Sequence, residues 1–364
     1  MWHCTAIKPT VNPTFAYIIV FALALGTSLL LIPIADVLGK RFGITAKPDA
    51  RRRTEGDQRR VSRLGGTAIF GGFTLAVIAA QFLPVERQDP YELIRLIGLL
   101  LGGTVIFAIQ LLDDIFDFSS LPQFMGQYAG AAIAIAFQIF IQYVSNPFTG
   151  QQTDPFPHIV TVTLSFFWIV GMVNTMNWLD GLDGLAGGVA VIAGLMLFIN
   201  SAFRVEPAQT SVSLLHLALV GASLGFLLHN FYPSRIFMGG GAPYLGFLLA
   251  TLSIIGGAKM ATILLVMGLP LVDAVWQVFN RARSGRNPFT GDRGHLHFRL
   301  LDLGWSQRRI VLAYYYFCTF FGVLALIIES ELYKFIALGV MIALVMVGLA
   351  VVTRLNIART PESP

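Results

Sequence analysis

Long apolar runs separated by short polar segments dominate the pattern of this chain. Eleven runs are candidate membrane-spanning helices, at residues 15–35, 64–83, 93–112, 124–144, 158–176, 185–203, 212–230, 242–256, 261–280, 310–329 and 334–353. Most reach the ~20 residues that a helix needs to cross a bilayer, although 242–256 is short. The pattern predicts an all-α, polytopic membrane protein, a bundle of about 11 transmembrane helices.

Composition supports the same class. The 364 residues are 55% hydrophobic and 12% charged, and the mean hydropathy is +0.70. Such values exclude an ordinary soluble domain, so we expect one integral membrane domain over residues 1–364, bound to lipid and to no nucleic acid. The two cysteines, Cys4 and Cys318, are far apart and predict neither a disulfide framework nor a metal site.

The basic residues predict the orientation in the membrane. Nineteen of the 25 Lys and Arg residues fall on one side of the eleven predicted spans, mainly in the loops after the first and ninth spans, and six fall on the other. Because cytoplasmic loops carry the excess of basic residues, we expect the N-terminus outside and the C-terminus in the cytoplasm. Part of this charge could also meet anionic lipid or phosphate.

Four amide or carboxylate side chains recur at every third position where one span meets water. They are Asn174, Asn177, Asp180 and Asp183. Residues three apart are neighbours on a helix, so the first three can form one polar ridge. A helix end, a turn and a cap would account for one of these groups; the cluster is better explained as a site for a metal or a polar headgroup.

A second acidic cluster lies at the inner end of the third span. Asp113 and Asp117 share a helical face, Asp114 also neighbours Asp117, and no basic residue occurs between Arg95 and Arg204. A charge at the bilayer centre costs roughly 2.5–3.5 kcal/mol. These acids therefore sit at a solvated helix end or hold a divalent metal or a phosphate-bearing substrate.

Further polar residues fall on the same predicted face. Arg63 precedes a Gly-Gly pair that permits close backbone approach, which favours a phosphate contact. Asp273 lies inside a span, as a functional acid or as half of a buried pair. The remaining candidates, in two loops, are Asn230, Phe237, His295, His297 and Arg299.

Carboxylates, arginines and histidines gathered on one membrane face suit a reaction between a water-soluble phosphate donor and a lipid phosphate acceptor. Mg²⁺ is the expected ion, with Mn²⁺ as an alternative, because Mg²⁺ favours oxygen ligands and substrate phosphates. The two histidines are flanked by arginines, which favours anion contact over a zinc site.

From about Arg63 to Arg309, these blocks in this order resemble the polyprenyl-phosphate N-acetylhexosamine-1-phosphate transferase superfamily. The resemblance implies a bundle of ten or eleven helices in the bacterial plasma membrane with a cytoplasmic active site. It implies transfer of a sugar 1-phosphate from a UDP-sugar to undecaprenyl phosphate, with release of UMP. This step begins O-antigen, teichoic acid or peptidoglycan lipid intermediates, and the family leaves room for a homodimer.

The resemblance also assigns roles by position. Asp113 and Asp114 match paired aspartates that act on the lipid phosphate, and Asp117 stands where the peptidoglycan branch usually has lysine, which favours the N-acetylhexosamine 1-phosphate branch. Asn177 matches an asparagine near the metal, which Asp114 would share. The donor-side matches are Asp180 and Asp183 in the nucleotide region, Asn230 and Phe237 at the uridine, and His295, His297 and Arg299 around the pyrophosphate.

Two positions depart from the family pattern. The family typically has Phe-Met-Gly-Asp where this chain has Gly240 after Gly239, so a metal-binding carboxylate is missing, and Phe298 replaces a frequent histidine. We expect Gly240→Asp to strengthen binding of the ion, provided that the glycine leaves room for a side chain.

Three other functions remain open. An intramembrane prenyltransferase also uses aspartates and Mg²⁺ but would not need the histidine loop. A polar-solute transporter would place its ionisable groups near the bilayer midplane, often in repeated halves. A catalytically impaired relative would bind lipid phosphate without transferring a sugar.

Overall fold

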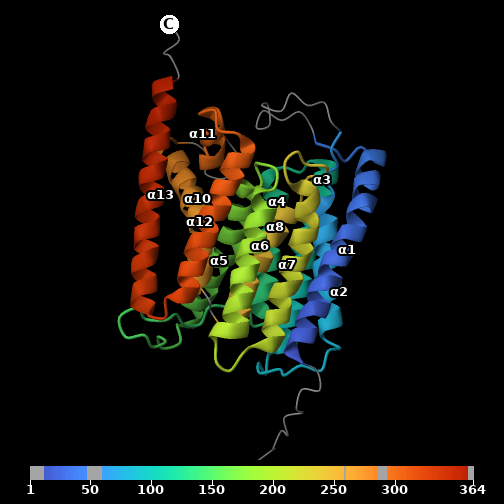
Figure 1. The fold of residues 1–364 in the computed structure, drawn as a ribbon, viewed down its shortest axis with the longest axis vertical. Coiled ribbons are helices and arrows are strands. Elements are labelled where there is room, and N and C mark those ends of the chain that lie inside the picture. The colour runs from blue at the N-terminus through green and yellow to red at the C-terminus, as the bar shows by residue number, and fades with distance from the viewer. Residues whose placement is uncertain (1–11, 47–59, 258–259, 286–292, 360–364) are drawn as a thin grey trace, which may run out of the picture.

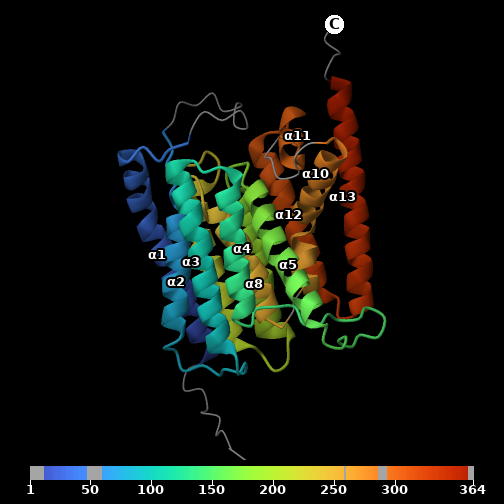
Figure 2. The same cartoon turned by 180° about the vertical axis from the view of Figure 1, so that it is seen from behind.

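The computed structural model describes residues 12–46, 60–257, 260–285 and 293–359. Figures 1 and 2 show a bundle of helices that run roughly parallel or antiparallel to one another. The helices are α1 (Pro13–Arg41), α2 (Gly65–Ala80), α3 (Glu92–Phe116), α4 (Ser120–Ala136), α5 (His158–Leu179), α6 (Leu185–Ile199), α7 (Thr210–Asn230), α8 (Gly241–Ile255), α9 (Met260–Val266), α10 (Gly268–Arg283), α11 (Leu296–Asp302), α12 (Gln307–Ile327) and α13 (Glu331–Arg359).

The prediction of an all-α, polytopic membrane protein is confirmed. The described part of the chain contains isolated β-bridges but no strand. Within those residues, seven helices are long and apolar enough to cross a membrane, or eight if the bent pair α9–α10 counts as one span. The shorter apolar helices α2 and α8 also coincide with predicted spans.

One predicted span is helical over only part of its length. The run 124–144 forms α4, which ends at Ala136, and the chain then turns at Gln138 with a φ of 67°. The following extended segment buries Ile139 and Ile141, and the Ile141 N–H donates to Ser165 Oγ at 2.8 Å. The apolar pattern predicted burial correctly, but burial is achieved by an extended segment that borrows a polar partner from α5.

The predicted span 261–280 is broken into two helices. α9 and α10 meet at Met267 with a bend of 76°. Pro270 lies in the first turn of α10, where its missing N–H is tolerated, whereas a continuous helix would set its ring against the carbonyl of Val266. The proline thus accounts for the break.

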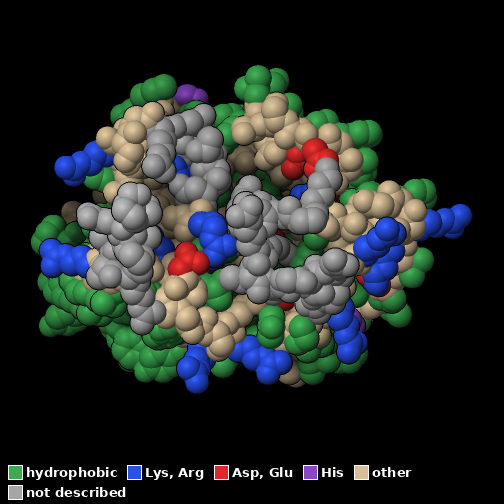
Figure 3. All heavy atoms as spheres, turned by 90° about the horizontal axis from the view of Figure 1, so that it is seen from above, with side chains coloured by type: hydrophobic (Ala, Val, Ile, Leu, Met, Phe, Trp, Pro, Cys, Tyr) green, Lys and Arg blue, Asp and Glu red, His purple; other side chains and the backbone are tan. Residues whose placement is uncertain are grey.

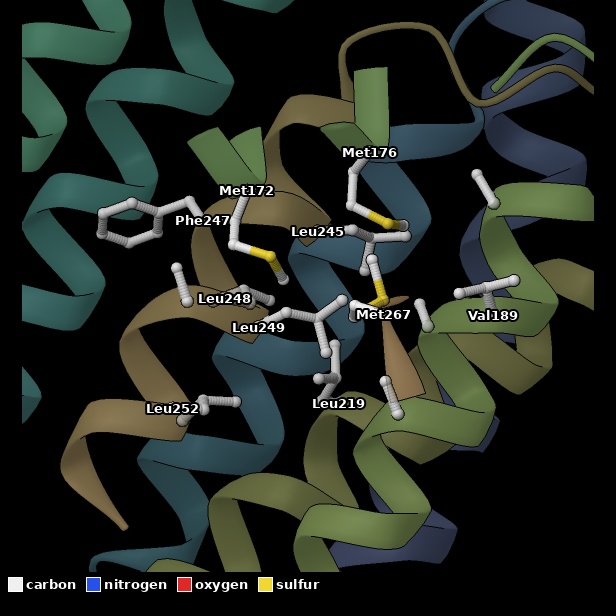
Figure 4. Close-up of a cluster of buried hydrophobic side chains, with 14 of the residues drawn as sticks. Met172, Met176, Val189, Leu219, Leu245, Phe247, Leu248, Leu249, Leu252 and Met267 are labelled. Atoms are coloured by element: carbon white, nitrogen blue, oxygen red, sulfur yellow. The ribbon is translucent and has the colours of Figure 1, made fainter. Parts of the chain in front are cut away.

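The centre of the bundle is formed by α7 and α8. Every residue of α8 is buried, and 83% of the most apolar stretch of α7 is buried, compared with 22% for α13 at the periphery. Because α8 is enclosed by protein, its short length need not match a bilayer. Figure 4 shows the packing around it, where side chains of α5, α6, α7 and α8 meet Met267 from the junction of α9 and α10; the labelled residues of those helices include Met172, Met176, Val189, Leu219, Leu245, Leu248 and Leu249.

A close contact between backbones joins the N-termini of α2 and α8. The Gly65 and Gly66 N–H groups donate to the carbonyls of Phe237 and Met238 at 3.0 and 2.9 Å. A Cβ on Gly66 would lie 2.6 Å from the Cα of Gly241. The Gly-Gly pair after Arg63 therefore does permit the backbone approach predicted from the sequence.

Candidate functional site

Five polar segments that are distant in sequence converge at one end of the bundle. They are the residues before α2, the end of α3, the α5–α6 turn, the α7–α8 loop, and the end of α10 with α11. Figure 3 looks onto this end, where basic and acidic side chains lie side by side near the middle of the face. We call it the polar end, and it holds the candidate residues predicted from the sequence.

The acids of α3 have a counterion that the sequence did not predict. Arg63 Nη2 lies 2.8 Å from Asp114 Oδ1, and Arg63 Nη1 lies 3.8 Å from Asp117 Oδ1. The Asp114 side chain is only 3% exposed, whereas that of Asp117 is 51% exposed. Arg63 therefore forms a charge-assisted bond to a buried carboxylate and spans two of the three acids.

The second oxygen of Asp114 is held by the α7–α8 loop. Asp114 Oδ2 accepts a hydrogen bond from the Gly240 N–H at 2.7 Å. Gly239 has a φ of 54°, and a Cβ there would collide with Arg63 O and Asp114 Oδ2, so only glycine fits this turn. Both carboxylate oxygens of Asp114 are thus engaged by the protein.

Gly240 does not leave room for a side chain, which corrects the expectation for Gly240→Asp. Its φ is −60°, so the backbone conformation itself is open to any residue. A Cβ would, however, lie 2.7 Å from the Cβ of Gln110 and 2.8 Å from its carbonyl carbon. Because part of the obstacle is helix backbone, an aspartate at Gly240 requires α3 and the loop to move apart.

Asp113 has more open surroundings than its neighbour. Its side chain is half-buried, and its Oδ1 accepts a hydrogen bond from Gln123 Nε2 at 3.0 Å. Asp113 is therefore the better placed of the two paired aspartates to meet a substrate.

The predicted ridge of Asn174, Asn177 and Asp180 is divided by the packing. Asn174 is buried, and its Nδ2 donates to Gln127 Oε1 at 2.8 Å and to Val170 O at 2.9 Å. Asn177 and Asp180 are half-buried at the end of α5. Asn174 thus secures α5 to α4, and the two residues after it carry the accessible part of the ridge.

Asp183 and Asn230 join the α5–α6 turn to the α7–α8 loop. Asp183 Oδ2 accepts from the Ser234 N–H at 3.0 Å. Asn230 Oδ1 accepts from the Gly184 N–H at 2.9 Å, and its Nδ2 donates to Ile236 O at 2.9 Å. Both side chains are buried, so in this structure they position the two loops. Contact of either with a nucleotide stays a prediction.

Phe237 and Arg299 are also tied to neighbouring segments. Phe237 is 8% exposed, and its N–H donates to Ser62 O at 2.8 Å. Arg299 donates from Nη1 to Thr353 Oγ1 on α13, and Asn356 Nδ2 on α13 donates to Arg299 O at 3.2 Å. Their predicted contacts with uracil and pyrophosphate are not tested by this geometry.

His295 belongs to a buried chain of polar contacts. Its Nδ1 lies 2.9 Å from Asp273 Oδ2, and its Nε2 lies 3.3 Å from Arg281 Nη2. Asp273 Oδ1 also accepts from the Leu296 N–H at 3.0 Å. The carboxylate and the guanidinium favour the neutral tautomer that donates from Nδ1 and accepts at Nε2. Asp273 is thus one half of a buried pair, which was one of the two interpretations of this acid from the sequence, and His295 is the other half.

His297 has very different surroundings, although it is two residues away. It is 1% exposed, and neither ring nitrogen has a hydrogen-bond partner among the described residues. Its ring stacks on that of His295 and touches Phe298, and a Cβ on Gly181 would collide with Nε2. Burial lowers the pKa of His297 to about 3. His297 is therefore neutral at physiological pH.

Sequence reasoning missed three residues that support this part of the site. Gln277 and Arg281 follow Asp273 on one buried face of α10, and Arg281 Cζ lies 5.5 Å from the ring centre of Trp178. Gln277 Nε2 donates to Gly294 O. The spacing of four residues from Asp273 was a visible signal, because such residues share a helix face.

The predicted metal pair, Asn177 with Asp114, does not fit a resident cation in this arrangement. Both oxygens of Asp114 already accept from donors, and an ion at this carboxylate would lie beside the positively charged guanidinium of Arg63. The described ranges also bring no three His, Cys, Asp or Glu residues into a group that could hold a metal ion.

The apolar helices define an integral membrane protein whose polar end gathers acidic, basic and imidazole side chains. Comparison with known proteins is more specific, since residues 96–257 match the model of glycosyl transferase family 4. The chain belongs to this family, within the polyprenyl-phosphate N-acetylhexosamine-1-phosphate transferase superfamily, and is accordingly a phosphotransferase.

Several curated relatives align over most of their length. A decaprenyl-phosphate N-acetylglucosaminephosphotransferase of Mycobacterium tuberculosis is 31% identical, covering 77% of this chain and 74% of its own. A probable undecaprenyl-phosphate N-acetylglucosaminyl 1-phosphate transferase of Bacillus subtilis is 27% identical, covering 86% and 85%. A phospho-N-acetylmuramoyl-pentapeptide-transferase of Desulfitobacterium hafniense is 28% identical, covering 84% and 95%.

Proposed function

We propose that this chain transfers N-acetylglucosamine 1-phosphate from a UDP-sugar to undecaprenyl phosphate and releases UMP. The proposed reaction takes place at the cytoplasmic face of the bacterial plasma membrane. It would be the first membrane step of a cell-envelope glycan such as lipopolysaccharide or teichoic acid. Relatives named for transfer of N-acetylglucosamine phosphate to prenyl phosphates support the choice of sugar and acceptor.

The observation that carries this proposal is the gathering of acidic, basic and imidazole groups at one end of an apolar bundle. A partly exposed acid, Asp113, lies beside Asp114 and its partner Arg63 at the end of α3. A long prenyl chain can remain in the bilayer while its phosphate reaches these groups, and a nucleotide sugar can approach from water.

In the proposed reaction, an oxygen of the acceptor phosphate attacks the phosphorus that carries the sugar. A new P–O bond forms, the bond to the bridging oxygen of UMP breaks, and UMP leaves with the electron pair. Phosphoryl transfer depends mainly on positioning and on neutralising charge. Asp113 would take up a proton from the acceptor phosphate or orient it, and Arg63 would attract the phosphate.

The donor would occupy the α5–α6 side of the polar end. Asn177 and Asp180 are half-buried there, and Trp178 lies between them in the sequence. Around the pyrophosphate, we expect the α11 region to contribute neutral imidazole and guanidinium groups, since His297 is uncharged and His295 contacts Arg281. We propose that Mg²⁺, or Mn²⁺ in its place, enters with the donor diphosphate and offsets its charge.

The transfer assay tests this proposal directly. Full-length protein in detergent or vesicles receives radiolabelled UDP-N-acetylglucosamine and undecaprenyl phosphate, and both lipid-linked label and released UMP are measured. We expect equal amounts of the two products, dependent on the acceptor lipid. A parallel donor series with UDP-N-acetylgalactosamine and UDP-N-acetylmuramoyl-pentapeptide identifies the preferred sugar.

The same assay separates the alternatives. Consumption of a prenyl diphosphate without any UDP-sugar would indicate a prenyltransferase. Binding of undecaprenyl phosphate without turnover of any donor would indicate a catalytically impaired relative. Uptake of label into vesicles without a lipid product would indicate a transporter. A homodimer stays a prediction. It is tested by measuring the protein mass of the protein–detergent complex after the mass of bound detergent is subtracted.

A further inference from the structure

The carboxylates at the end of α3 already have a cation built into the fold. Arg63 reaches Asp114 at 2.8 Å and Asp117 at 3.8 Å, from a segment about fifty residues earlier in the chain. The Arg63 side chain is 28% exposed, whereas the Asp114 side chain that it contacts is 3% exposed. Arg63 therefore offsets part of the repulsion among the acids.

The backbone completes this arrangement. The Gly240 N–H donates to the oxygen of Asp114 that Arg63 does not hold. A side chain at Gly240 would collide with Gln110, so this loop cannot add a carboxylate to the cluster without moving. Arg63 and one backbone donor together satisfy the buried carboxylate.

A divalent ion bound to the same acids would have to share Asp114 with the guanidinium or displace it. Bringing both cations against Asp114 places like charges a few ångströms apart, and removing Arg63 from a buried carboxylate leaves a charge without its partner. An ion at this position would therefore gain less than it would from free carboxylates.

We propose that Arg63 serves as the resident counterion of Asp114 and Asp117, in the place where a protein-bound divalent cation would otherwise be needed. This inference deepens the proposed function, because it assigns the resident positive charge at the acceptor side to a side chain and leaves any divalent ion to the donor. The acceptor phosphate then meets a fixed guanidinium.

The test measures Mn²⁺ binding by electron paramagnetic resonance, with purified full-length protein and no substrate. We expect the wild type to bind no Mn²⁺ that depends on Asp114. Arg63→Gln removes the charge and should create a site that binds Mn²⁺ at least tenfold more tightly than the wild type. Adding Asp114→Asn to this variant should abolish the gain, and Arg63→Lys should behave as the wild type does.

Each result decides the question. Mn²⁺ binding by the wild type that is lost in Asp114→Asn would overturn the proposal, as would a folded Arg63→Gln variant with no gain. If Arg63→Gln fails to fold, the comparison of the wild type with Asp114→Asn and Arg63→Lys still decides it. Because no substrate is present, failure of the transfer assay would sink the proposed function and leave this binding result standing.

Discussion

Adjacent carboxylates can have different tasks, and Asp113 and Asp114 illustrate this at the scale of single residues. Asp114 is buried and holds both Arg63 and the Gly240 N–H, whereas Asp113 is half-buried with a bond from Gln123. Asp114 therefore joins two elements of the fold, and Asp113 is the group with access to a substrate.

Conservative substitutions should separate the two roles. Asp113→Asn should lower transfer at least ~100-fold with little change in stability, because it removes a proton acceptor but keeps an amide oxygen that can accept the bond from Gln123. Asp114→Asn should also lower transfer but should destabilise the protein by about 1–3 kcal/mol, because one donor loses its charged acceptor. Transfer and the thermal unfolding midpoint are measured for both. Equal destabilisation by the two changes would contradict this division.

His297 makes stability depend on pH. Its pKa is about 3 in the folded protein and ordinarily 6.5, so the unfolded chain binds more protons between these values. His297 therefore does not oppose folding above pH 6.5, where it is neutral in both states. As the pH falls from 6.5 toward 3, the free energy of unfolding decreases progressively, because the unfolded chain takes up a proton that the folded protein does not.

The matching prediction compares two histidine variants. The unfolding temperature of the wild type should decrease when the pH is lowered from 7 to 5. The unfolding temperature of His297→Asn should decrease less, because the asparagine side chain does not titrate. His158→Asn, at the exposed first residue of α5, is the control and should keep the wild-type dependence. Parallel curves for the wild type and His297→Asn would show that His297 is not the titrating group.

At the scale of elements, the close packing of α3 on the α7–α8 loop leaves no space for a side chain at Gly240. Substitution by alanine should destabilise the protein by about 1–3 kcal/mol, because the new Cβ meets the Gln110 backbone. Gly240→Asp should destabilise the protein at least as much and should not lower the Mg²⁺ concentration needed for half-maximal transfer.

Gly171 is the matched control, because it is a helical glycine of α5 with nothing within 4 Å of an added Cβ. Gly171→Ala should leave the unfolding midpoint unchanged or slightly raised, since alanine favours a helix. A stable, active Gly240→Ala would mean that the loop lies farther from α3 than the structure places it.

At the scale of the whole molecule, the polar end should face the cytoplasm. Ser284 is exposed at the end of α10, and Gln152 is exposed in the α4–α5 segment at the opposite end (Figure 1). In a Cys4→Ser background, with Cys318 buried, an impermeant maleimide added to intact cells should label Gln152→Cys and spare Ser284→Cys. Inside-out vesicles should give the reverse. Labelling of both positions from one side would overturn the predicted topology.

Much of the architecture could be predicted from the chain alone. Each predicted span coincides with at least one helix, because a chain in hydrocarbon must satisfy its backbone bonds within a helix and long apolar runs therefore have few alternatives. The break at Met267 has a visible cause in Pro270. The seven-residue helix α11 gave no comparable signal, because it is too short for a periodic pattern.

What the sequence determined by itself is the class of protein and the set of polar groups at the polar end, because hydropathy and local spacing are properties of neighbouring residues. Only the tertiary structure decided that Arg63 neutralises Asp114, that Asp273 pairs with His295 while His297 is left unpaired among the described residues, and that Gly240 has no room for an acid. These contacts join residues that are distant in sequence. Their distances depend on how the helices pack, which no local pattern encodes.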